Sequence, residues 1–154
     1  MTDDLSNLIK ELADVVSALE SVGIDYAVCG GLALTIHGFP RATFDLDVLI
    51  REENLPRAFD AVRPLGYDIH GLDISFKERT VEIRRVSKID PAGEVLSLDF
   101  LLVTAFVEDV WESRIKLPWE VTEMWLVSKE GLIKMKEQSG RPKDLIDIDT
   151  LKND

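Results

Sequence analysis

Hydrophobic positions near the start of the chain recur at intervals of three and four residues. The recurring positions are Leu5, Leu8, Ile9, Leu12, Val15, Val16 and Leu19. This spacing predicts an amphipathic helix with one buried face. Thr2, Asp3 or Asp4 can cap the start of this helix, and Gly23 can end it.

Shorter patterns follow this helix. Residues 26–29 form an apolar run that precedes two glycines and predicts a buried strand. Residues 32–37 predict a short helix, which Gly38 and Pro40 close. Residues 44–50 alternate between apolar and acidic side chains, and this alternation is typical of a half-buried strand.

The rest of the chain continues to mix helical and strand patterns. The predicted elements are a helix over 54–65, two strands within 69–86, a strand over 95–102, a short helix over 104–111, a strand within 119–127, a helix that Ser128 caps and that runs to 138, and a last helix that begins at Pro142. Helices and strands alternate, but the strands cluster in the middle of the chain. We therefore expect an α+β fold, with a mixed β-sheet flanked by helices, in a single domain over residues 1–154.

Composition narrows the class of protein. The chain has 154 residues, of which 45% are hydrophobic and 31% charged, as in ordinary globular domains. Its only cysteine, Cys29, excludes an internal disulfide. We find no secretory signal and no apolar run long enough for a membrane span, so a cytoplasmic location is the default expectation. The net charge of −11 excludes a broad nucleic-acid-binding surface and disfavours anionic membranes.

Two acids on the strand over 44–50 give the first indication of chemistry. Asp45 and Asp47 are two residues apart and therefore project from the same face of the strand. Their charges repel unless a cation lies between them, and Mg²⁺ binds one or two carboxylates together with substrate phosphates. Taken alone, such a pair is more often two solvated acids on an exposed edge strand.

Two further features strengthen this interpretation. Gly30 and Gly31 lie where a strand gives way to a helix, so backbone N–H groups there can hold a phosphate; a tight strand-to-helix turn is the alternative. On the strand over 95–102 the even positions are all large and apolar, and Asp99 lies on the other face among largely apolar neighbours. If this strand pairs beside that of Asp45, three carboxylates converge, which is the minimum for two-metal nucleotidyl transfer. A nearby Lys or Arg could instead satisfy Asp99.

The combined pattern resembles a known family. Residues 30–38, Gly-Gly-Leu-Ala-Leu-Thr-Ile-His-Gly, and residues 41–47, Arg-Ala-Thr-Phe-Asp-Leu-Asp, are similar to the signature of the DNA polymerase β-like nucleotidyltransferase superfamily. Within it, the chain resembles the minimal nucleotidyltransferases of the AbiEii-toxin-like branch. Residues 128–147 are similar to the C-terminal helix pair of that group, and the resemblance covers residues 26–151.

The resemblance implies roles for three acids and one lysine. Asp45, Asp47 and Asp99 would hold Mg²⁺, or Mn²⁺ in its place, and Asp99 would also activate the hydroxyl of the acceptor. Lys136 would face the triphosphate of the NTP substrate. Without the resemblance, Lys136 is more often interpreted as a position on a solvated helix face.

The glycines and the residues before the acidic strand complete the implied site. Gly30 and Gly31 would cradle the phosphates of the nucleotide, although many members of the superfamily have Gly-Ser here and gain one more hydrogen bond. Thr43 would fix the loop, and Arg41 would reach a phosphate or pair with Asp45. Hydrogen bonds from Arg41 to loop carbonyls are an equally consistent alternative.

Other charged residues allow simpler interpretations. The basic residues concentrated in one stretch are Lys77, Arg79, Arg84, Arg85 and Lys88. This basic cluster could contact a nucleotide or an RNA acceptor, but a solvated hairpin face is the commoner case. Asp144 and Asp147 share a helix face and are expected to pair with basic residues. Cys29 is expected in the core, and the two histidines do not suggest a zinc site.

Three hypotheses about function follow. The first is an Mg²⁺-dependent transfer of NMP from an NTP to a hydroxyl of a protein, RNA or small molecule, with a toxin or defence role implied by the resemblance. The second is a nucleotide-binding module without turnover. The third is an interaction protein, since an acidic face can dock a basic partner. The resemblance also implies a partner. Larger members of the nucleotidyltransferase superfamily carry an extra helical domain, so substrate selection in this chain would need a partner protein or a homodimer.

Overall fold

The computed structural model describes residues 2–38, 45–76, 80–119 and 122–139, together with 149 and 152. The helices are α1 (Thr2–Ser21), α2 (Gly30–Ile36), α3 (Leu55–Val62), α4 (Glu108–Glu112) and α5 (Lys129–Ser139). The short 3-10 turns are η1 (Glu52–Asn54), η2 (Arg63–Leu65) and η3 (Ala105–Val107). The strands are β1 (Ala27–Cys29), β2 (Asp45–Ile50), β3 (Ile69–His70), β4 (Ile74–Phe76), β5 (Val81–Ile89), β6 (Val95–Leu102), β7 (Ile115–Trp119) and β8 (Thr122–Leu126).

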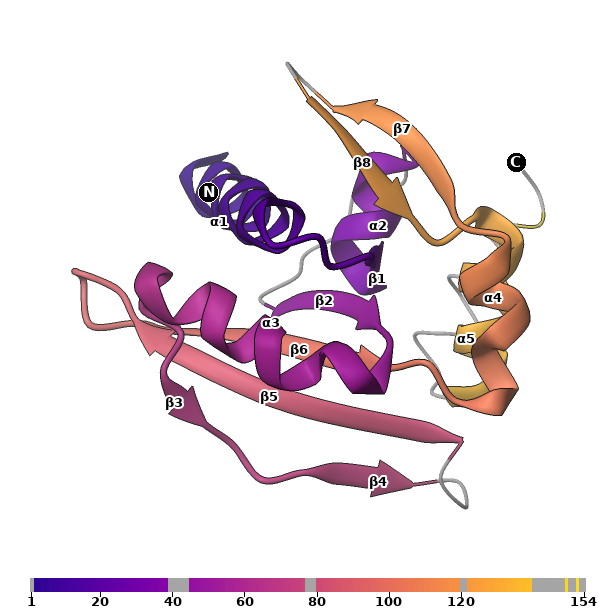
Figure 1. Ribbon diagram of the computed structural model, residues 1–154. Coiled ribbons are helices and arrows are strands. Elements are labelled where there is room, and N and C mark those ends of the chain that lie inside the picture. Colours follow the sequence, from indigo (N-terminus) through magenta and orange to yellow (C-terminus); the bar gives the residue numbers. More distant parts are fainter. Residues whose placement is uncertain are drawn as a thin grey trace.

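All of these strands join one mixed sheet. Its order is β3-β5-β6-β2-β1-β8-β7, and β4 also pairs with β5. β2 lies parallel to β6 and β1 parallel to β8, whereas the other neighbours are antiparallel. In Figure 1 the β7–β8 hairpin lies at one end of the sheet, and β3 and β4 lie at the other. The predicted α+β fold, with a mixed sheet flanked by helices, is confirmed.

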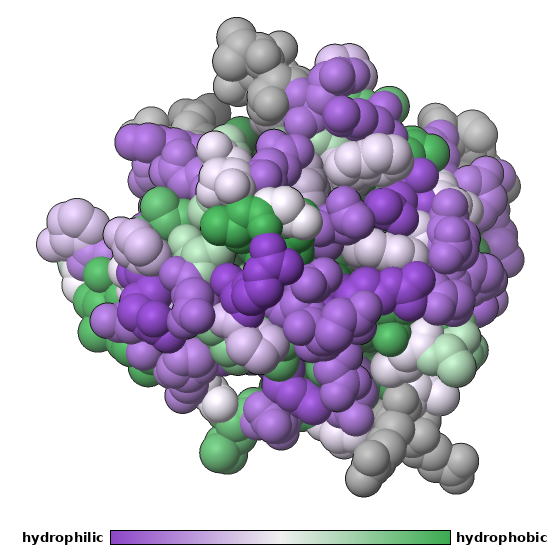
Figure 2. Space-filling view, in the orientation of Figure 1, coloured by the Kyte–Doolittle hydropathy of each residue, from purple (hydrophilic) through white to green (hydrophobic). Residues whose placement is uncertain are grey.

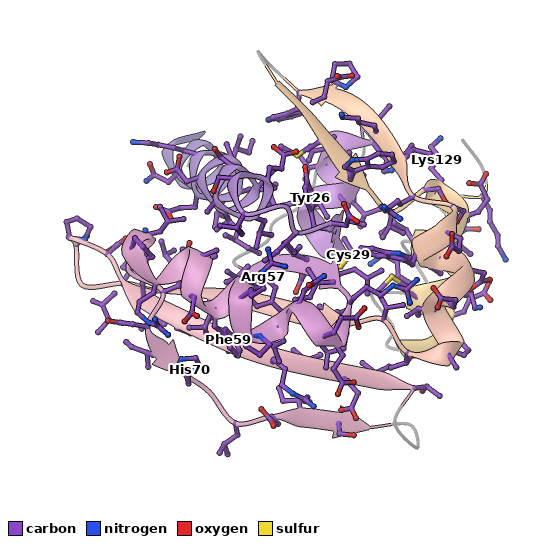
Figure 3. All side chains as sticks on the ribbon, viewed as in Figure 1. Tyr26, Cys29, Arg57, Phe59, His70 and Lys129 are labelled. Carbon is purple, nitrogen blue, oxygen red and sulfur yellow. The ribbon has the colours of Figure 1, made fainter. Side chains whose placement is uncertain are left out.

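Helices α1 and α3 cover one face of the sheet. Phe59 of α3 packs edge-to-face on Phe100 of β6, with ring centroids 5.8 Å apart, and on His70 of β3, at 4.7 Å (Figure 3). Helix α1 reaches the same face, because the Tyr67 hydroxyl donates a hydrogen bond of 2.8 Å to Glu11 of α1. The opposite face of β2, β6 and β5 carries the row Asp47, Asp99 and Arg85 beside an apolar row of Leu49, Leu101 and Ile83.

Several predicted elements are confirmed almost to the residue. The strand predicted over 95–102 is β6, and the helix predicted over 54–65 is α3 with its flanking 3-10 turns. The cap at Ser128 is also present, since the backbone N–H of Gly131 donates to Ser128 Oγ at 3.1 Å. The last helix, predicted to begin at Pro142, lies outside the described residues.

Three boundaries differ from the predictions. The segment 69–86 holds parts of three strands rather than two, because β3 and β4 both pair with β5 and are separated by a break at Gly71. Strand β7 was not predicted; it contains Pro118, which is tolerated because β7 lies at the edge of the sheet. Helix α2 begins at Gly30, two residues earlier than expected.

The surface is largely hydrophilic on the face seen in Figure 2, with smaller separate hydrophobic patches among the hydrophilic residues. The most exposed large apolar side chains of the described residues include Leu72, Val95 and Ile89. In the part of the chain that the structure describes, no helix is both long and apolar enough to cross a membrane.

Candidate active site

The parallel pairing of β2 and β6 brings the predicted acids together. The register places Asp47 opposite Asp99 and Asp45 opposite Ser97. Side chains of directly opposed residues project from the same face of a sheet, so the three carboxylates share one face. The row through Asp47 continues on both sides, to Cys29 of β1 and to Arg85 of β5. The predicted convergence of the three acids on one sheet face is therefore present.

Gly30 is required at this site by a close approach of Asp47. Its φ of +68° lies in the left-handed region that favours glycine. A Cβ atom placed on Gly30 would overlap Oδ2 of Asp47 and lie 2.8 Å from its Cγ. The glycine at the start of α2 thus makes room for the Asp47 carboxylate, which holds this carboxylate against the turn between β1 and α2.

The environment of Asp47 disfavours its charge. The side chain keeps some contact with water, but burial among protein atoms, followed by the negative charges of Asp99 and Asp45, raises its pKa to about 7. Arg85 and Lys136 act in the opposite direction. Because the two nearby carboxylates repel Asp47, an added cation at this point would be stabilising.

Asp99 is bound by an arginine. Its Oδ1 accepts a hydrogen bond of 2.7 Å from Arg85 Nε, and its Oδ2 accepts one of 2.9 Å from Arg85 Nη2. Arg85 Nη2 also lies 3.8 Å from Asp45 Oδ2. This bidentate geometry is the strong form of an arginine–carboxylate pair, and the hydrogen bonds to Asp99 raise the pKa of Arg85. The alternative in which an arginine satisfies Asp99 is also present in this structure.

The predicted basic cluster does not act as one surface. Arg84 and Lys88 lie on the face of β5 opposite to Arg85, since side chains alternate along a strand. Arg84 contacts Glu82 and Asp73, at 3.4 Å and 3.5 Å. Lys88 contacts Glu11 of α1 at 2.6 Å. Lys77 and Arg79 are outside the described residues.

The remaining predicted site residues have different outcomes. Lys136 of α5 lies close enough for its charge to lower the pKa of Asp47 and of Cys29, and its proposed contact with the triphosphate stays a prediction. Arg41 and Thr43 lie outside the described residues, and their roles stay predictions. Asp144 and Asp147, also outside the described residues, stay predictions as well.

Cys29 is buried, as predicted, at the end of β1 (Figure 3). Burial, followed by the charges of Asp47 and Asp99, raises the pKa of its thiol. The neutral thiol lies beside Asp47 in the same cross-strand row and borders the carboxylates with a buried, uncharged side chain. His37 has a structural role, since its Nε2 lies 2.9 Å from the carbonyl oxygen of Val127.

The carboxylates fit a divalent cation in part. Asp45 and Asp47 project together, and burial, followed by the negative charges of Asp99 and Asp45, raises the pKa of Asp47, so this pair has the character of a Mg²⁺ ligand pair. Within the described ranges, no three side chains of the His, Cys, Asp and Glu types form a ready metal site in their present positions. Asp99 would join the pair only after its contact with Arg85 opens.

Arg85 was not singled out from the basic cluster by the sequence. The signal that could have found it is the alternation of β5: if Asp99 needs a partner, that partner must lie on the same face of a neighbouring strand. The register then selects Arg85 and excludes Arg84 and Lys88.

Comparison with solved structures defines the class of fold. TM1012 of Thermotoga maritima, a proposed nucleotidyltransferase, matches over 96% of this chain and 94% of its own, with a TM-score of 0.66 and 10% identity. The enzyme ANT(2")-Ia, in complex with adenylyl-2"-tobramycin, matches over 94% of this chain and 87% of its own, with a TM-score of 0.61 and 12% identity. This chain has the fold of nucleotidyltransferases.

A third solved structure agrees with these two. The lincosamide antibiotic adenylyltransferase LnuA, with lincomycin bound, matches over 93% of this chain and 95% of its own, with a TM-score of 0.55 and 14% identity. No model of a protein family matches the sequence, and no curated protein does. The likeness is therefore one of fold, and the chemistry has to be argued from the chain's own residues.

Proposed function

We propose that this chain transfers a nucleoside monophosphate from an NTP to a hydroxyl group of an acceptor. The observation that carries the proposal is the position of Asp45, Asp47 and Asp99 on adjacent parallel strands, beside Gly30, in a nucleotidyltransferase fold. Three carboxylates on one face serve no purpose in packing, since they repel one another. They are suited to a reaction in which cations and phosphates meet.

The three acids share one role in this proposal, and Asp99 has a second. Asp45, Asp47 and Asp99 would hold Mg²⁺, or Mn²⁺ in its place; when bound, the ion would neutralise negative charge on the phosphate oxygens. Gly30 and Gly31 would lie against the phosphates, and Lys136 would add positive charge to the same side of the site. These residues bind and orient the nucleotide, which is the larger part of catalysis in phosphoryl and nucleotidyl transfer.

The transfer itself needs a proton acceptor. The acceptor's hydroxyl oxygen forms a bond to the α-phosphorus, and the bond from that phosphorus to the bridging oxygen of pyrophosphate breaks. Asp99 would take the proton of the attacking hydroxyl, while the electron pair of the broken bond leaves with pyrophosphate. Asp99 can do this only with a free carboxylate oxygen, so its contact with Arg85 must open first.

The acceptor and biological role belong to the same proposal. Among the fold neighbours, LnuA is an antibiotic adenylyltransferase and ANT(2")-Ia binds an adenylylated tobramycin. We therefore include small hydroxylated molecules among the acceptors, beside proteins and RNA. The AbiEii-like assignment, a toxin or defence role, and a partner protein or homodimer are supported by the sequence resemblance alone.

A second candidate function is nucleotide binding without turnover. The observation that favours it is the bidentate contact of Arg85 with Asp99. This contact engages both oxygens of the carboxylate that the first candidate needs as its proton acceptor. In such a module the nucleotide would bind, and no pyrophosphate would be released. The two candidates therefore differ in turnover rather than in binding.

Calorimetric titration tests the shared part of both candidates. ATP, CTP, GTP and UTP are titrated with Mg²⁺ and with EDTA into the wild type and into Asp45→Asn/Asp47→Asn. The matched control is Asp60→Asn/Asp109→Asn, which removes the same charge at two exposed acids away from the site. We expect Mg²⁺-dependent binding of at least one nucleotide that the site variant loses and the control keeps.

Two further outcomes separate the hypotheses. If no nucleotide binds, the interaction-protein hypothesis is favoured and the proposal fails. If a nucleotide binds, transfer of a radiolabelled NMP is screened over small molecules, proteins and RNA with the wild type and Asp45→Asn. Label transfer that Asp45→Asn retains at the wild-type rate would contradict the assigned roles, and binding without pyrophosphate release from any acceptor would favour the second candidate.

A further inference from the structure

One contact at this site opposes metal binding. The guanidinium of Arg85 binds both oxygens of Asp99, at 2.7 Å and 2.9 Å, and lies 3.8 Å from Asp45. A single cationic side chain therefore stands against two of the three acids that the proposed function assigns to a metal.

The contact comes from outside the strand pair that bears the acids. Arg85 and Asp99 are direct neighbours across β5 and β6, and β2 lies on the other side of β6. The guanidinium thus extends over β6 toward β2 to approach Asp45. A cation shared by Asp99 and Asp45 would therefore have to compete with this guanidinium.

Burial of the two partners is unequal. The side chain of Asp99 is 7% exposed, whereas that of Arg85 is 38% exposed. The Arg85 side chain can therefore rotate toward solvent without disturbing the core, because a guanidinium is well solvated at the surface. The carboxylate cannot follow it, and a buried carboxylate without a partner is strongly destabilising.

A purely structural role for the pair is a weaker account. β5 and β6 are already aligned along their length, from Ile83 opposite Leu101 to Ile89 opposite Val95. The backbone ladder fixes the register, so the strands do not require a bidentate ion pair to stay together. The charge of Arg85 has a clearer use, which is to compensate the carboxylates.

We propose that Arg85 is an internal counter-ion that occupies Asp99 until a divalent cation replaces it. This inference rests on the proposed function, since it concerns the same carboxylates. In the metal-free protein, Arg85 keeps Asp99 paired and the sheet face stable. Entry of the cation exchanges one positive partner for another and frees Arg85, so Asp99 becomes available only in a loaded site.

The exchange makes a prediction about metal affinity that does not depend on turnover. A cation that takes Asp99 as a ligand must displace Arg85, and this displacement weakens its binding. Arg85→Gln removes the competitor and keeps a side chain of similar length. We expect the dissociation constant for Mn²⁺ alone, measured by electron paramagnetic resonance of free Mn²⁺ without nucleotide, to fall about tenfold, or ~1.4 kcal/mol.

The adjacent arginine offers a matched control. Arg84→Gln makes the same change one residue away, on the opposite face of β5, where Arg84 pairs with Glu82 and Asp73. We expect it to leave Mn²⁺ affinity within about twofold of the wild type. Unchanged or weaker Mn²⁺ binding in Arg85→Gln, with wild-type circular dichroism, would overturn the proposal.

Further variants identify the acid and guard against misfolding. Arg85→Lys keeps the charge but cannot bind both oxygens, so the dissociation constant should fall about two- to threefold. If Arg85→Gln does not fold, Arg85→Lys becomes the test of the proposal. An Mn²⁺ affinity of Arg85→Lys that is equal to or lower than that of the wild type would then contradict the proposal. In Arg85→Gln/Asp99→Asn the gain should disappear; a gain that persists shows that Asp99 is not the withheld carboxylate.

Failure of this inference can be distinguished from failure of the proposed function. If Asp45→Asn/Asp47→Asn binds Mn²⁺ as the wild type does, the proposed metal site is wrong, whatever Arg85 does. If that variant loses Mn²⁺ while Arg85→Gln gains nothing, the metal site stands and only the role of Arg85 is refuted.

Discussion

Two clusters of charged side chains lie on opposite faces of β5 and its neighbours, and they differ in how their charges balance. On the face that α1 covers, Lys88 binds Glu11 at 2.6 Å and lies over the ring of Tyr67. On the other face, Arg85 meets Asp99 and approaches Asp45, with Asp47 beside them. In the first cluster Lys88 is matched to Glu11, whereas the second brings three acids to Arg85, with the charge of Lys136 also acting on Asp47.

The difference separates stability from function. In the balanced cluster, which consists of Lys88, Glu11 and Tyr67, the polar groups bind one another or the backbone. The Tyr67 hydroxyl donates to Glu11, and Lys88 also donates to the Leu65 carbonyl at 3.2 Å. In the acidic cluster, which consists of Asp45, Asp47, Asp99 and Arg85, the pKa of Asp47 is raised to about 7. Burial is the larger cause, and the charges of Asp99 and Asp45 follow. A fold keeps such an excess of one charge at a point where something else is to bind.

The largest expected effect tests the close approach of Gly30 and Asp47. Gly30→Ala should lower the free energy of unfolding by about 3 kcal/mol, because its Cβ would overlap the carboxylate as well as strain the backbone. Gly23→Ala is the control, since its φ of +73° is nearly the same and no atom lies within 4 Å of the added Cβ. It should cost about 1 kcal/mol.

Urea unfolding of both variants measures this difference. Equal losses in the two would show that the packing of Asp47 against Gly30 is not tight, and that only the backbone conformation requires glycine. Titration of Mn²⁺ into the folded fraction adds a second measurement. Gly30→Ala should weaken Mn²⁺ binding because it displaces Asp47, whereas Gly23→Ala should not change it.

Much of the acidic cluster was predictable because its signals are local. A strand period of two places Asp45 and Asp47 on one face and sets Asp99 apart from the apolar face of β6. The observed strand, Val95–Leu102, coincides with the predicted one. The convergence of the three acids was conditional on β2 pairing with β6, and the alternation within either strand does not specify that pairing.

The parts that were missed depend on long-range partners. The choice of Arg85 among neighbouring basic residues follows from the register of β5 against β6, which side-chain alternation within β5 cannot set. Strands β3 and β4 are short edge pieces, and exposed Ile69 and Ile74 weaken their apolar pattern. Strand β7 was not predicted because it contains Pro118, and proline in a sequence argues against a strand unless that strand lies at the edge of a sheet.

The next effect in size tests the balanced cluster. Lys88→Met keeps the apolar stem over Tyr67 but removes the charge that faces Glu11, so the free energy of unfolding should fall by about 2 kcal/mol. Affinity for Mn²⁺ should stay within about twofold of the wild type, because Lys88 lies on the other face of the sheet. A marked change in Mn²⁺ binding would show that the two clusters are coupled.

The smallest effect has the opposite sign and depends on pH. Since the pKa of Asp47 is about 7 in the folded chain and near 3.8 without the fold, the unfolded chain loses this proton first as pH rises. The contribution of Asp47 to stability is present below about pH 3.8 and is lost as pH rises through about 7. Removal of the charge should therefore stabilise the protein at high pH.

Asp47→Asn tests this sign directly. Its free energy of unfolding relative to the wild type should rise by about 1 kcal/mol between pH 4 and pH 8, with the size reduced because the carboxyl keeps some contact with water. Asp60→Asn, at an exposed acid that pairs with Arg63, should show no such rise. Added Mg²⁺ should stabilise the wild type and not Asp47→Asn, which would remove the variant's advantage at pH 8. An advantage of Asp47→Asn that is constant with pH would mean that the Asp47 carboxylate is not destabilised by its neighbours, and the contrast between the two clusters would then lose its electrostatic basis.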